Sequence, residues 1–533
     1  MKLKLTLRGN VRNVLVAAAL SGSLFGTAPA AQAETTLKVV MQSGLRILDP
    51  IMATAYLTRD HGYMIYDTLL GKDEHFEPRP QMASWQVSDD QLTYTFTLRD
   101  DLRWHDGTPV TAEDCIASIN RWGTVDSVGQ VLMTMVKSID VLQARQFRIV
   151  LDQPTPLVLD GLSKISSRPA FMMPKRIADT PASQPITEYI GSGPFKFVAS
   201  AFKPGLQVVY EKNKDYVPRD EPPSWLAGGK RVNVDRVVWE AMPDQMTAVN
   251  ALQNGEVDYV QQVPFDLLPV LANQPEVKVD VLDQLGSWTY FRMNHLYPPF
   301  DNKLVRQAAI AAVGQEDVLK ALVGDPQYYR PCAAVLGCGG PLGDNYGADW
   351  VIPSRIDKAK ALLAEAKYDG TPVVVLQPTD MAMVAAQPVV IGAALRKAGF
   401  NVKMKTVDWQ SVVAQQNNQN SPQEGGWNIM ATYSILAATG DPISNGTLVA
   451  NGRKAWAGWP DVPEMEALRL KYAQTTDTAE RKQIAAKIQQ VAIDEGVVAP
   501  LGQFQIPSAY STKLTDVLRA PITVFWNLKK ADK

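Results

Sequence analysis

The sequence predicts a mixed α/β protein of two or three domains. The chain has 533 residues, of which 46% are hydrophobic and 20% are charged. A globular chain of this length exceeds what one hydrophobic core serves, so several domains are expected. Segments in which apolar residues alternate are interleaved with segments in which they recur at helical spacing, and this order is typical of α/β architecture.

The first 33 residues have the features of a secretory signal peptide. An apolar run from Val14 to Phe25 is followed by the small-residue segment 31–33, and it is preceded by the basic residues Lys2, Lys4, Arg8 and Arg12. The run is shorter than the roughly 20 residues that span a bilayer. We expect cleavage before Glu34 and a soluble mature protein in the periplasm; an uncleaved membrane anchor is the alternative.

Two strands and a helix are predicted in the first third of the chain. Apolar side chains alternate over 92–98 and again over 147–151, as in half-buried strands. Thr111, followed by two acids, marks the start of a helix that is expected to run to about Trp122. The sequence His-Asp-Gly at 105–107 predicts a turn that leads into this helix.

Regular elements are also predicted in the last third of the chain. A strand at 373–376, a helix at 386–397 that ends at Gly399, and a strand at 402–406 form a strand-helix-strand unit. Two helices are expected farther on, followed by one more strand, and these three elements lie at 463–473, 478–493 and 497–504.

Composition argues against several function classes. The formal net charge is −2, and no run of five or more Lys or Arg lies outside the N-terminal region, so nucleic acid is not an expected partner. No nucleophile elbow or complete dinucleotide fingerprint is present. The four histidines lack metal-ligand spacing, and they are His61, His75, His105 and His295. We expect no metal, no cofactor and no enzyme activity, with an exported enzyme of unrecognised site as the alternative.

The three cysteines predict one disulfide. Cys332 and Cys338 enclose five residues rich in small side chains, and the expected compartment is oxidising. Cys115 falls inside the helical pattern of Ile116 and Ile119, where a buried, inert thiol is expected.

A long motif and several shorter ones connect the chain to a known family. The segment Leu98–Asp114 has the sequence LRDDLRWHDGTPVTAED, and shorter motifs follow the same order as in that family at 48–50, 66–70, 191–195, 251–258 and 299–307. Over essentially the whole mature chain, the sequence resembles solute-binding protein family 5, the dipeptide, oligopeptide and nickel binders. Most of the motif residues, including 105–107 and Gly255, are expected to shape turns and not to bind ligand.

The resemblance implies a periplasmic binding protein-like fold, with two lobes around a ligand cleft and an additional domain (cluster C type). Lobe I would comprise 34–75, 192–285 and 505–533, the additional domain 76–191, and lobe III 286–504. The hinge would lie near 285–287 and 504–506. Closure would bury a peptide or peptide-like solute and present one closed shape to the permease and ATPase of an inner-membrane ABC importer. We expect a monomer.

The same resemblance places pocket residues in segments that border the cleft in relatives. Aromatic residues with polar tips suit a solute that has both apolar and polar parts, although a given Trp more often belongs to the core. The candidates are Gly44, Leu45, Arg46, Trp288, Thr289, Trp409, Trp427, Tyr433, Ser434, Gln503 and Phe504.

One departure from the family bears on the solute. In peptide-binding relatives an Asp follows the strand that corresponds to 427–433 and meets the free α-amino group of the peptide. Here Ala437 or Ala438 stands at that position, and Asp441 fits the Asp of the family's following Asp-Pro. A buried ammonium without a counter-charge costs on the order of several kcal/mol. Amine-free or amine-blocked peptides, opine-like or sugar-acid conjugates, and metal chelates therefore stay open, as does recognition of the amine elsewhere.

We predict that an unmodified di- or tripeptide binds weakly, because its ammonium would lose water without gaining a partner near Ala437. N-acetylation should not weaken binding in calorimetric titrations. Tight binding that is lost on acetylation would show that another acid anchors the amine.

Overall fold

Three β-sheets organise the part of the chain that the structure describes. The computed structural model describes residues 34–242 and 244–531, so the predicted signal peptide lies outside the described residues. From Thr35 onward the chain forms one compact unit. Within the described ranges, no helix combines the length and the apolar character needed to cross a membrane.

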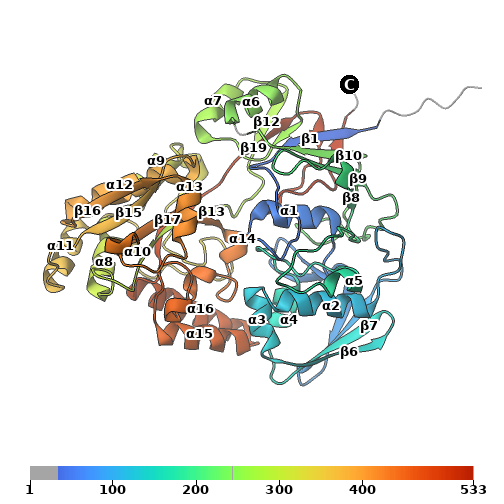
Figure 1. Ribbon diagram of the computed structural model, residues 1–533, viewed down its shortest axis with the longest axis horizontal. Helices are drawn as coiled ribbons and strands as arrows, with labels where there is room; N and C mark the ends of the chain where they lie inside the picture. Colours follow the sequence, from blue (N-terminus) through green and yellow to red (C-terminus); the bar gives the residue numbers. More distant parts are fainter. Residues whose placement is uncertain (1–33, 243, 532–533) are drawn as a thin grey trace, which may run out of the picture. The chain divides into compact units, whose positions relative to one another are not determined.

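The first sheet has seven strands, which come from three separate parts of the sequence (Figure 1). β1 runs parallel to β10 and β11, while the other neighbours are antiparallel. In spatial order the strands are β12 (Val277–Asp280), β19 (Ser508–Ser511), β11 (Tyr259–Val260), β1 (Thr36–Val40), β10 (Arg236–Glu240), β9 (Gln207–Lys212) and β8 (Phe195–Phe197). Its helices are α1 (Tyr56–Ile65), α6 (Gln245–Gln253) and α7 (Leu268–Leu271).

The second sheet is four-stranded and antiparallel. Its order is β4 (Ala83–Val87), β5 (Thr93–Leu98), β7 (Gln146–Leu151) and β6 (Val136–Gln143). The accompanying helices are α2 (Ala112–Gly123), α3 (Ser127–Met133), α4 (Leu157–Leu162) and α5 (Lys175–Ala178). Thr111 and Asp114 form a capping box at the start of α2. The predicted strands and helix are therefore confirmed here.

The third sheet has six strands. Its order is β14 (Tyr329–Arg330), β18 (Ala499–Phe504), β13 (Ser287–Met293), β17 (Ile429–Ile435), β15 (Val373–Pro378) and β16 (Val402–Val407). The helices that accompany it are α8 (Lys303–Ala312), α9 (Gln315–Leu322), α10 (Ala348–Val351), α11 (Ile356–Glu365), α12 (Ala382–Ala398), α13 (Trp409–Gln415), α14 (Leu436–Thr439), α15 (Pro463–Gln474) and α16 (Thr478–Asp494). Two small two-stranded sheets, β2 (Leu70–Lys72) with β3 (Pro78–Pro80) and β20 (Leu514–Thr515) with β21 (Lys529–Lys530), complete the strands of the described residues.

Three predicted boundaries differ from the structure by two residues or more. Strand β15 ends at Pro378 and not at 376. Helix α12 begins at Ala382 and not at 386, because packing around the fully buried Val384 extends it over an additional turn. Strand β18 begins at Ala499 and not at 497. The end of α12 is as expected, since Gly399 has φ +108° and terminates the helix.

The chain passes between the first and third sheets at two places, 281–286 and 505–507, which we call the hinge crossings. The first joins β12 to β13 and the second joins β18 to β19. Strand pairing places the two side by side, since Ser287 faces Phe504 and Asp280 faces Ser508. This is where the resemblance located the hinge. The hinge and the domain boundaries themselves stay predictions.

A disulfide closes the segment between Cys332 and Cys338. The structure joins the two Sγ atoms, while Cys115 is a buried thiol. Gln503 holds the loop from the neighbouring strand, because its Oε1 accepts the backbone N–H of Cys338 at 2.7 Å.

We predict one reactive thiol per chain in denatured, unreduced protein from the periplasm, and three after reduction. Closing so short a loop should contribute about 2 kcal/mol by the chain-entropy estimate. Three thiols without reductant would show that the disulfide does not form in cells.

Candidate ligand-binding cleft

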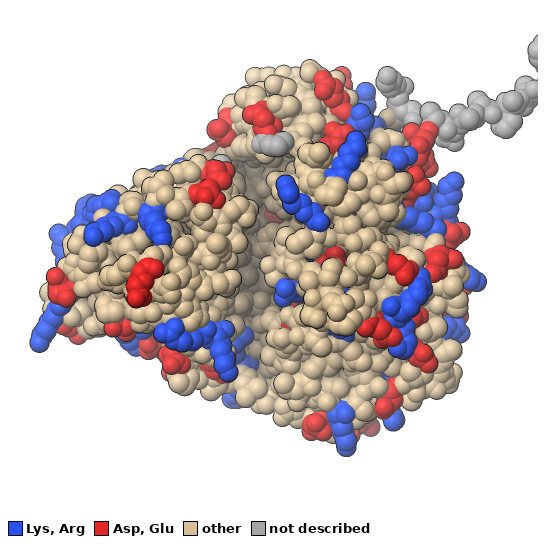
Figure 2. Space-filling view, in the orientation of Figure 1, with Lys and Arg blue, Asp and Glu red and all other residues tan. Residues whose placement is uncertain are grey.

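Two cavities and a more open groove, described below, lie between parts of the chain that belong to different sheets. The larger of the two cavities, called here the interlobe cavity, has a volume of about 180 Å³. Its wall combines Phe76 and Leu157 with Leu342, Leu436 and Ala437, so residues far apart in sequence enclose one space. Figure 2 shows a groove in this face of the molecule, between the part that carries α12 and the part that carries α1.

An ion-pair cluster closes one side of the interlobe cavity. Arg481 on α16 lies 2.9 Å from Asp160 on α4 and 3.8 Å from Asp441. Its guanidinium carbon also sits 4.2 Å from the centre of the Tyr472 ring. The Asp160 pair links the domain of the four-stranded sheet to the lobe of the six-stranded sheet, so the cluster contributes to closure of the cleft.

Asp441 is largely occupied by contacts within its own lobe. One carboxylate oxygen accepts the backbone N–H groups of Ile443 and Ser444, and the other accepts the Tyr472 hydroxyl at 2.9 Å. Ala437 lines the cavity beside it and carries no charge. The wall near Ala437 therefore offers a solute mainly apolar contact.

The second cavity, called here the hinge cavity, has a volume of about 70 Å³ and borders both hinge crossings. Leu282, Asp283 and Ile506 contribute to its wall from the crossings, and Ile435 contributes from the end of β17. The first turns of α1 supply Tyr56, Arg59 and Asp60.

A buried ion pair lies at this cavity. Arg59 and Asp60 side chains are 3% and 1% exposed, and both Nε and Nη2 of Arg59 donate to the same Asp60 oxygen, at 2.9 and 2.8 Å. The other Asp60 oxygen accepts from Gln261 at 3.4 Å. Nη1 of Arg59 has no hydrogen-bond partner among the described residues. A buried charged donor is thus left unsatisfied, which is uncommon in folded proteins.

Burial also changes the acids of the hinge cavity. It raises the pKa of Asp283 from 3.8 to about 7, although the backbone N–H groups of Gly286 and Leu285 and the charge of Arg59 oppose the shift. Burial raises the pKa of Asp60 as well, against the opposing effect of Arg59. Near neutral pH, Asp283 is therefore present in both its charged and its neutral form.

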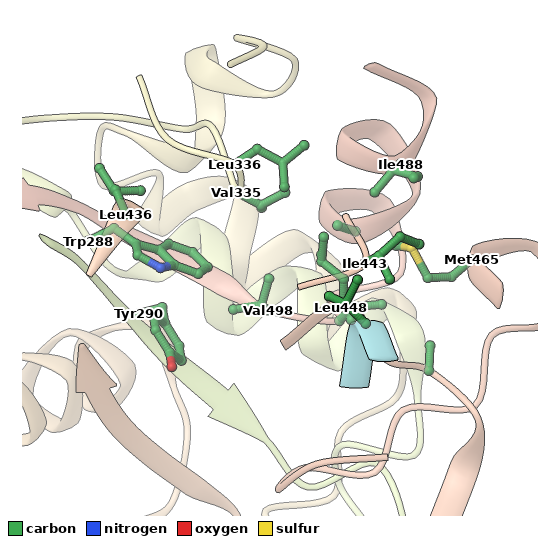
Figure 3. Close-up of a cluster of buried hydrophobic side chains, with 14 of the residues drawn as sticks. Trp288, Tyr290, Val335, Leu336, Leu436, Ile443, Leu448, Met465, Ile488 and Val498 are labelled. Atoms are coloured by element: carbon green, nitrogen blue, oxygen red, sulfur yellow. The ribbon is translucent and has the colours of Figure 1, made fainter. Parts of the chain in front are cut away.

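The predicted residues on β13 and β17 lie close to these cavities. Trp288 is buried against Tyr290, with ring centroids 4.4 Å apart, and its indole Nε1 has no partner among the described residues. Ser434 hydrogen bonds to the Tyr290 hydroxyl at 2.9 Å. Thr289 is fully buried, and its hydroxyl donates to the Thr432 carbonyl. Figure 3 shows Trp288, Tyr290 and Leu436 in one apolar cluster.

Three other candidates lie beside an open groove or in the wall of a further cavity. Tyr433 packs edge-on against Phe504, with centroids 5.7 Å apart, beside an open groove of about 850 Å³ that both lobes line. Gln503 and Phe504 line a further cavity of about 150 Å³ together with Arg330.

The remaining candidates make contacts inside single lobes. Trp427 is fully buried against Trp459 and donates its indole N–H to the Gln415 carbonyl, while the half-buried Trp409 packs on the same cluster. The segment 44–46 packs on the turn at Gly205, where the Leu45 carbonyl accepts the Gly205 N–H at 2.7 Å. None of the eleven candidates lines the interlobe or hinge cavity among the described residues, so their role in binding stays a prediction.

Sequence reasoning missed the charged residues of the hinge cavity. Arg59 and Asp60 lie in α1, where every residue from Leu57 to Ile65 is buried. The run Thr-Arg-Asp-His at 58–61 was an available signal, because four polar residues in succession within a short helix place some of them on its inner face. The sequence around Asp283 has no comparable pattern that would indicate a buried acid.

Comparison with known proteins agrees with this architecture. The family model for bacterial extracellular solute-binding proteins, family 5 Middle, matches residues 77–456. A probable peptide ABC transporter periplasmic-binding protein of Sinorhizobium fredii is 41% identical over 96% of both chains. Two solved structures share the fold. A binding protein of A. tumefaciens R10 in complex with agropinic acid (23% identity, TM-score 0.77) covers 93% of this chain and 99% of its own. A dipeptide-binding protein of Pseudoalteromonas with Met-Leu (20%, 0.77) covers 93% and 100%.

The raised pKa of Asp283 predicts a pH-dependent stability. Between pH of about 4 and 7 the folded protein holds a proton on Asp283 that the unfolded chain has released, so the stability falls as pH rises through this window. Asp283→Asn removes this titration and keeps an oxygen that can accept the Leu285 N–H. Relative to wild type, the variant should gain about 1 to 2 kcal/mol between pH 5 and pH 8 in urea unfolding, a value discounted for partial exposure.

The exposed Asp89 provides the control for this experiment. Asp89→Asn should show no such gain. An Asp283→Asn effect of equal size at both pH values would contradict the raised pKa.

Proposed function

Because the chain belongs to the bacterial extracellular solute-binding proteins of family 5, we propose that it captures a peptide or peptide-like solute in the cleft between its lobes and delivers it to an ABC importer. The observation that carries the proposal is the interlobe cavity, whose wall combines residues of the additional domain with residues of lobe III. Such a wall exists only when the parts are closed on each other, which is how a solute can stabilise the closed form.

The properties of the cavity wall indicate the kind of solute. Leu342, Leu436 and Ala437 offer apolar contact, while the acids Asp160 and Asp441 are already paired with Arg481. A solute with an apolar part and no free ammonium at this position fits such a wall. Acids of the opine kind are included in this class, and the agropinic acid complex of a protein with the same fold is in keeping with that.

We place the protein in the periplasm as a monomer that changes no bond in its solute. The ABC transporter names of its relatives support delivery to a permease and an ATPase in the inner membrane. The closed form would present residues of both lobes to the permease at once, so that a solute-loaded receptor differs in shape from an empty one.

A cavity-filling variant tests the proposal. Ala437→Trp should fill the interlobe cavity and reduce the solute that co-purifies from the periplasm to about a tenth of the wild-type amount or less, as measured by mass spectrometry. Re-added solute should raise the melting temperature of stripped wild-type protein and leave that of the variant unchanged.

Ala393→Trp, on the exposed face of α12, is the matched control. It should retain the solute fully. Equal retention by both variants would place the site elsewhere, and a change in the mass of the solute after incubation with stoichiometric protein would show an enzyme.

A further inference from the structure

The wall of the hinge cavity includes the Arg59 side chain, and one of its nitrogen atoms has no hydrogen-bond partner among the described residues. Arg59 can donate five hydrogen bonds. Its Nε and Nη2 meet Asp60, but Nη1 is buried and has no partner among the described residues. Leaving a buried charged donor unsatisfied is costly, so its presence indicates that a partner is missing.

Two other buried arginines show what a purely structural role requires. Arg292 is fully buried, and its three nitrogens donate to the carbonyls of Ala457, Thr447, Val497 and Trp456. Arg121 donates to both oxygens of Asp49 and to two carbonyls, so it is satisfied as well. Neither residue lines the interlobe or the hinge cavity. Arg59 differs from both, because it keeps an unpaired nitrogen and lines the hinge cavity; Arg481 likewise keeps its Nε unpaired at the interlobe cavity.

Arg59 lies where α1 meets the hinge crossings and the six-stranded sheet. Its cavity is bordered by Asp283 and Ile506 of the two hinge crossings and by Ile435 of the six-stranded sheet. The backbone N–H of Ile435 also donates to the Tyr56 hydroxyl, at 3.2 Å, so α1 contacts the other lobe at this point. A group bound in the hinge cavity would touch both lobes.

We propose that the hinge cavity binds a carboxylate of the solute, with Nη1 of Arg59 as its charged donor. This inference rests on the proposed function and adds the class of solute. A guanidinium suits a carboxylate in charge and in geometry. The cavity, at about 70 Å³, has room for such a group but not for a whole peptide. The remainder of the solute would extend along the cleft toward the interlobe cavity, because residues 435 and 436 border one cavity each.

The neighbouring acids are compatible with an anion. Asp60 neutralises Arg59 without occupying Nη1. Asp283 accepts the Leu285 N–H with one oxygen, and its neutral form can donate a hydrogen bond to a carboxylate. A solute that instead presents only an ammonium to Asp283 would leave Arg59 unsatisfied, and the experiment below distinguishes this case.

The test begins with the solute that the mature wild-type protein retains in the periplasm. Carbodiimide coupling of the released solute to glycine ethyl ester should add at least one mass increment, which reports a carboxylate. Esterifying that carboxylate should weaken rebinding to stripped wild-type protein at least tenfold in calorimetry. A retained solute that has an amine but no carboxylate, or an ester that binds as well as the acid, would overturn the proposal.

Matched variants identify the residue. Arg59→Gln with Asp60→Asn replaces the ion pair by two neutral amides and should reduce retention at least tenfold, with an unchanged circular dichroism spectrum. The control pair Arg148→Gln with Asp140→Asn makes the same exchange at an exposed ion pair that lines neither cavity, and it should retain the solute. Full retention by the double variant would refute the role of Arg59. If the double variant does not fold, the ester experiment on wild type decides.

The two proposals fail differently in this experiment. Wild-type protein that retains no solute and is stabilised by none would refute solute capture itself. A solute that is retained, and is lost in Ala437→Trp, but does not depend on its carboxylate leaves capture standing and refutes only the role of the hinge cavity.

Discussion

The two hinge crossings are the constraint on which the cleft depends. Strand pairing holds them side by side, because β13 pairs with β18 in one sheet and β12 pairs with β19 in the other. If the crossings act as the hinge that the resemblance implies, two adjacent connections permit rotation of one lobe on the other while they limit translation. Residues on α1, at the end of β17 and on the crossings can therefore meet around one small space, although they are far apart in sequence.

Contact between the lobes determines which charged side chains of the cleft are paired. Once the lobes meet, Arg481 is shielded from water and is paired with Asp160 across the domain boundary. Such a pair contributes little to stability on an exposed surface, but removing one partner of a buried pair is costly. Arg59 is paired within its own helix, with Asp60, and both arginines keep one buried nitrogen without a partner among the described residues, Nη1 in Arg59 and Nε in Arg481. In the closed form, Arg481 and Asp160 thus connect two domains, and Arg59 has a nitrogen that no described residue hydrogen bonds.

Local sequence was sufficient for most of the secondary structure. Thr111 and Asp114 marked the start of α2 because a capping box needs only residues close together in the chain, and Gly399 marked the end of α12 for the same reason. The start of α12 was placed four residues late, because that turn is stabilised by burial of Val384 and not by a local signal. The two-lobe fold came from the family resemblance, which also implied a position for the hinge, and no local pattern contains either.

By itself, the sequence determined the α/β class, the family and the absence of a carboxylate at Ala437 and Ala438, because each of these depends on residue identity or on short-range spacing. Only the tertiary structure decided which side chains face the cavities. Trp427 is aromatic and lies on the expected strand segment, yet it packs in a core. Arg59 and Asp283, which are 224 positions apart in the numbering, share the wall of the hinge cavity. Their proximity arises from packing of α1 against the crossings, and long-range packing of this kind leaves no periodic mark in the sequence.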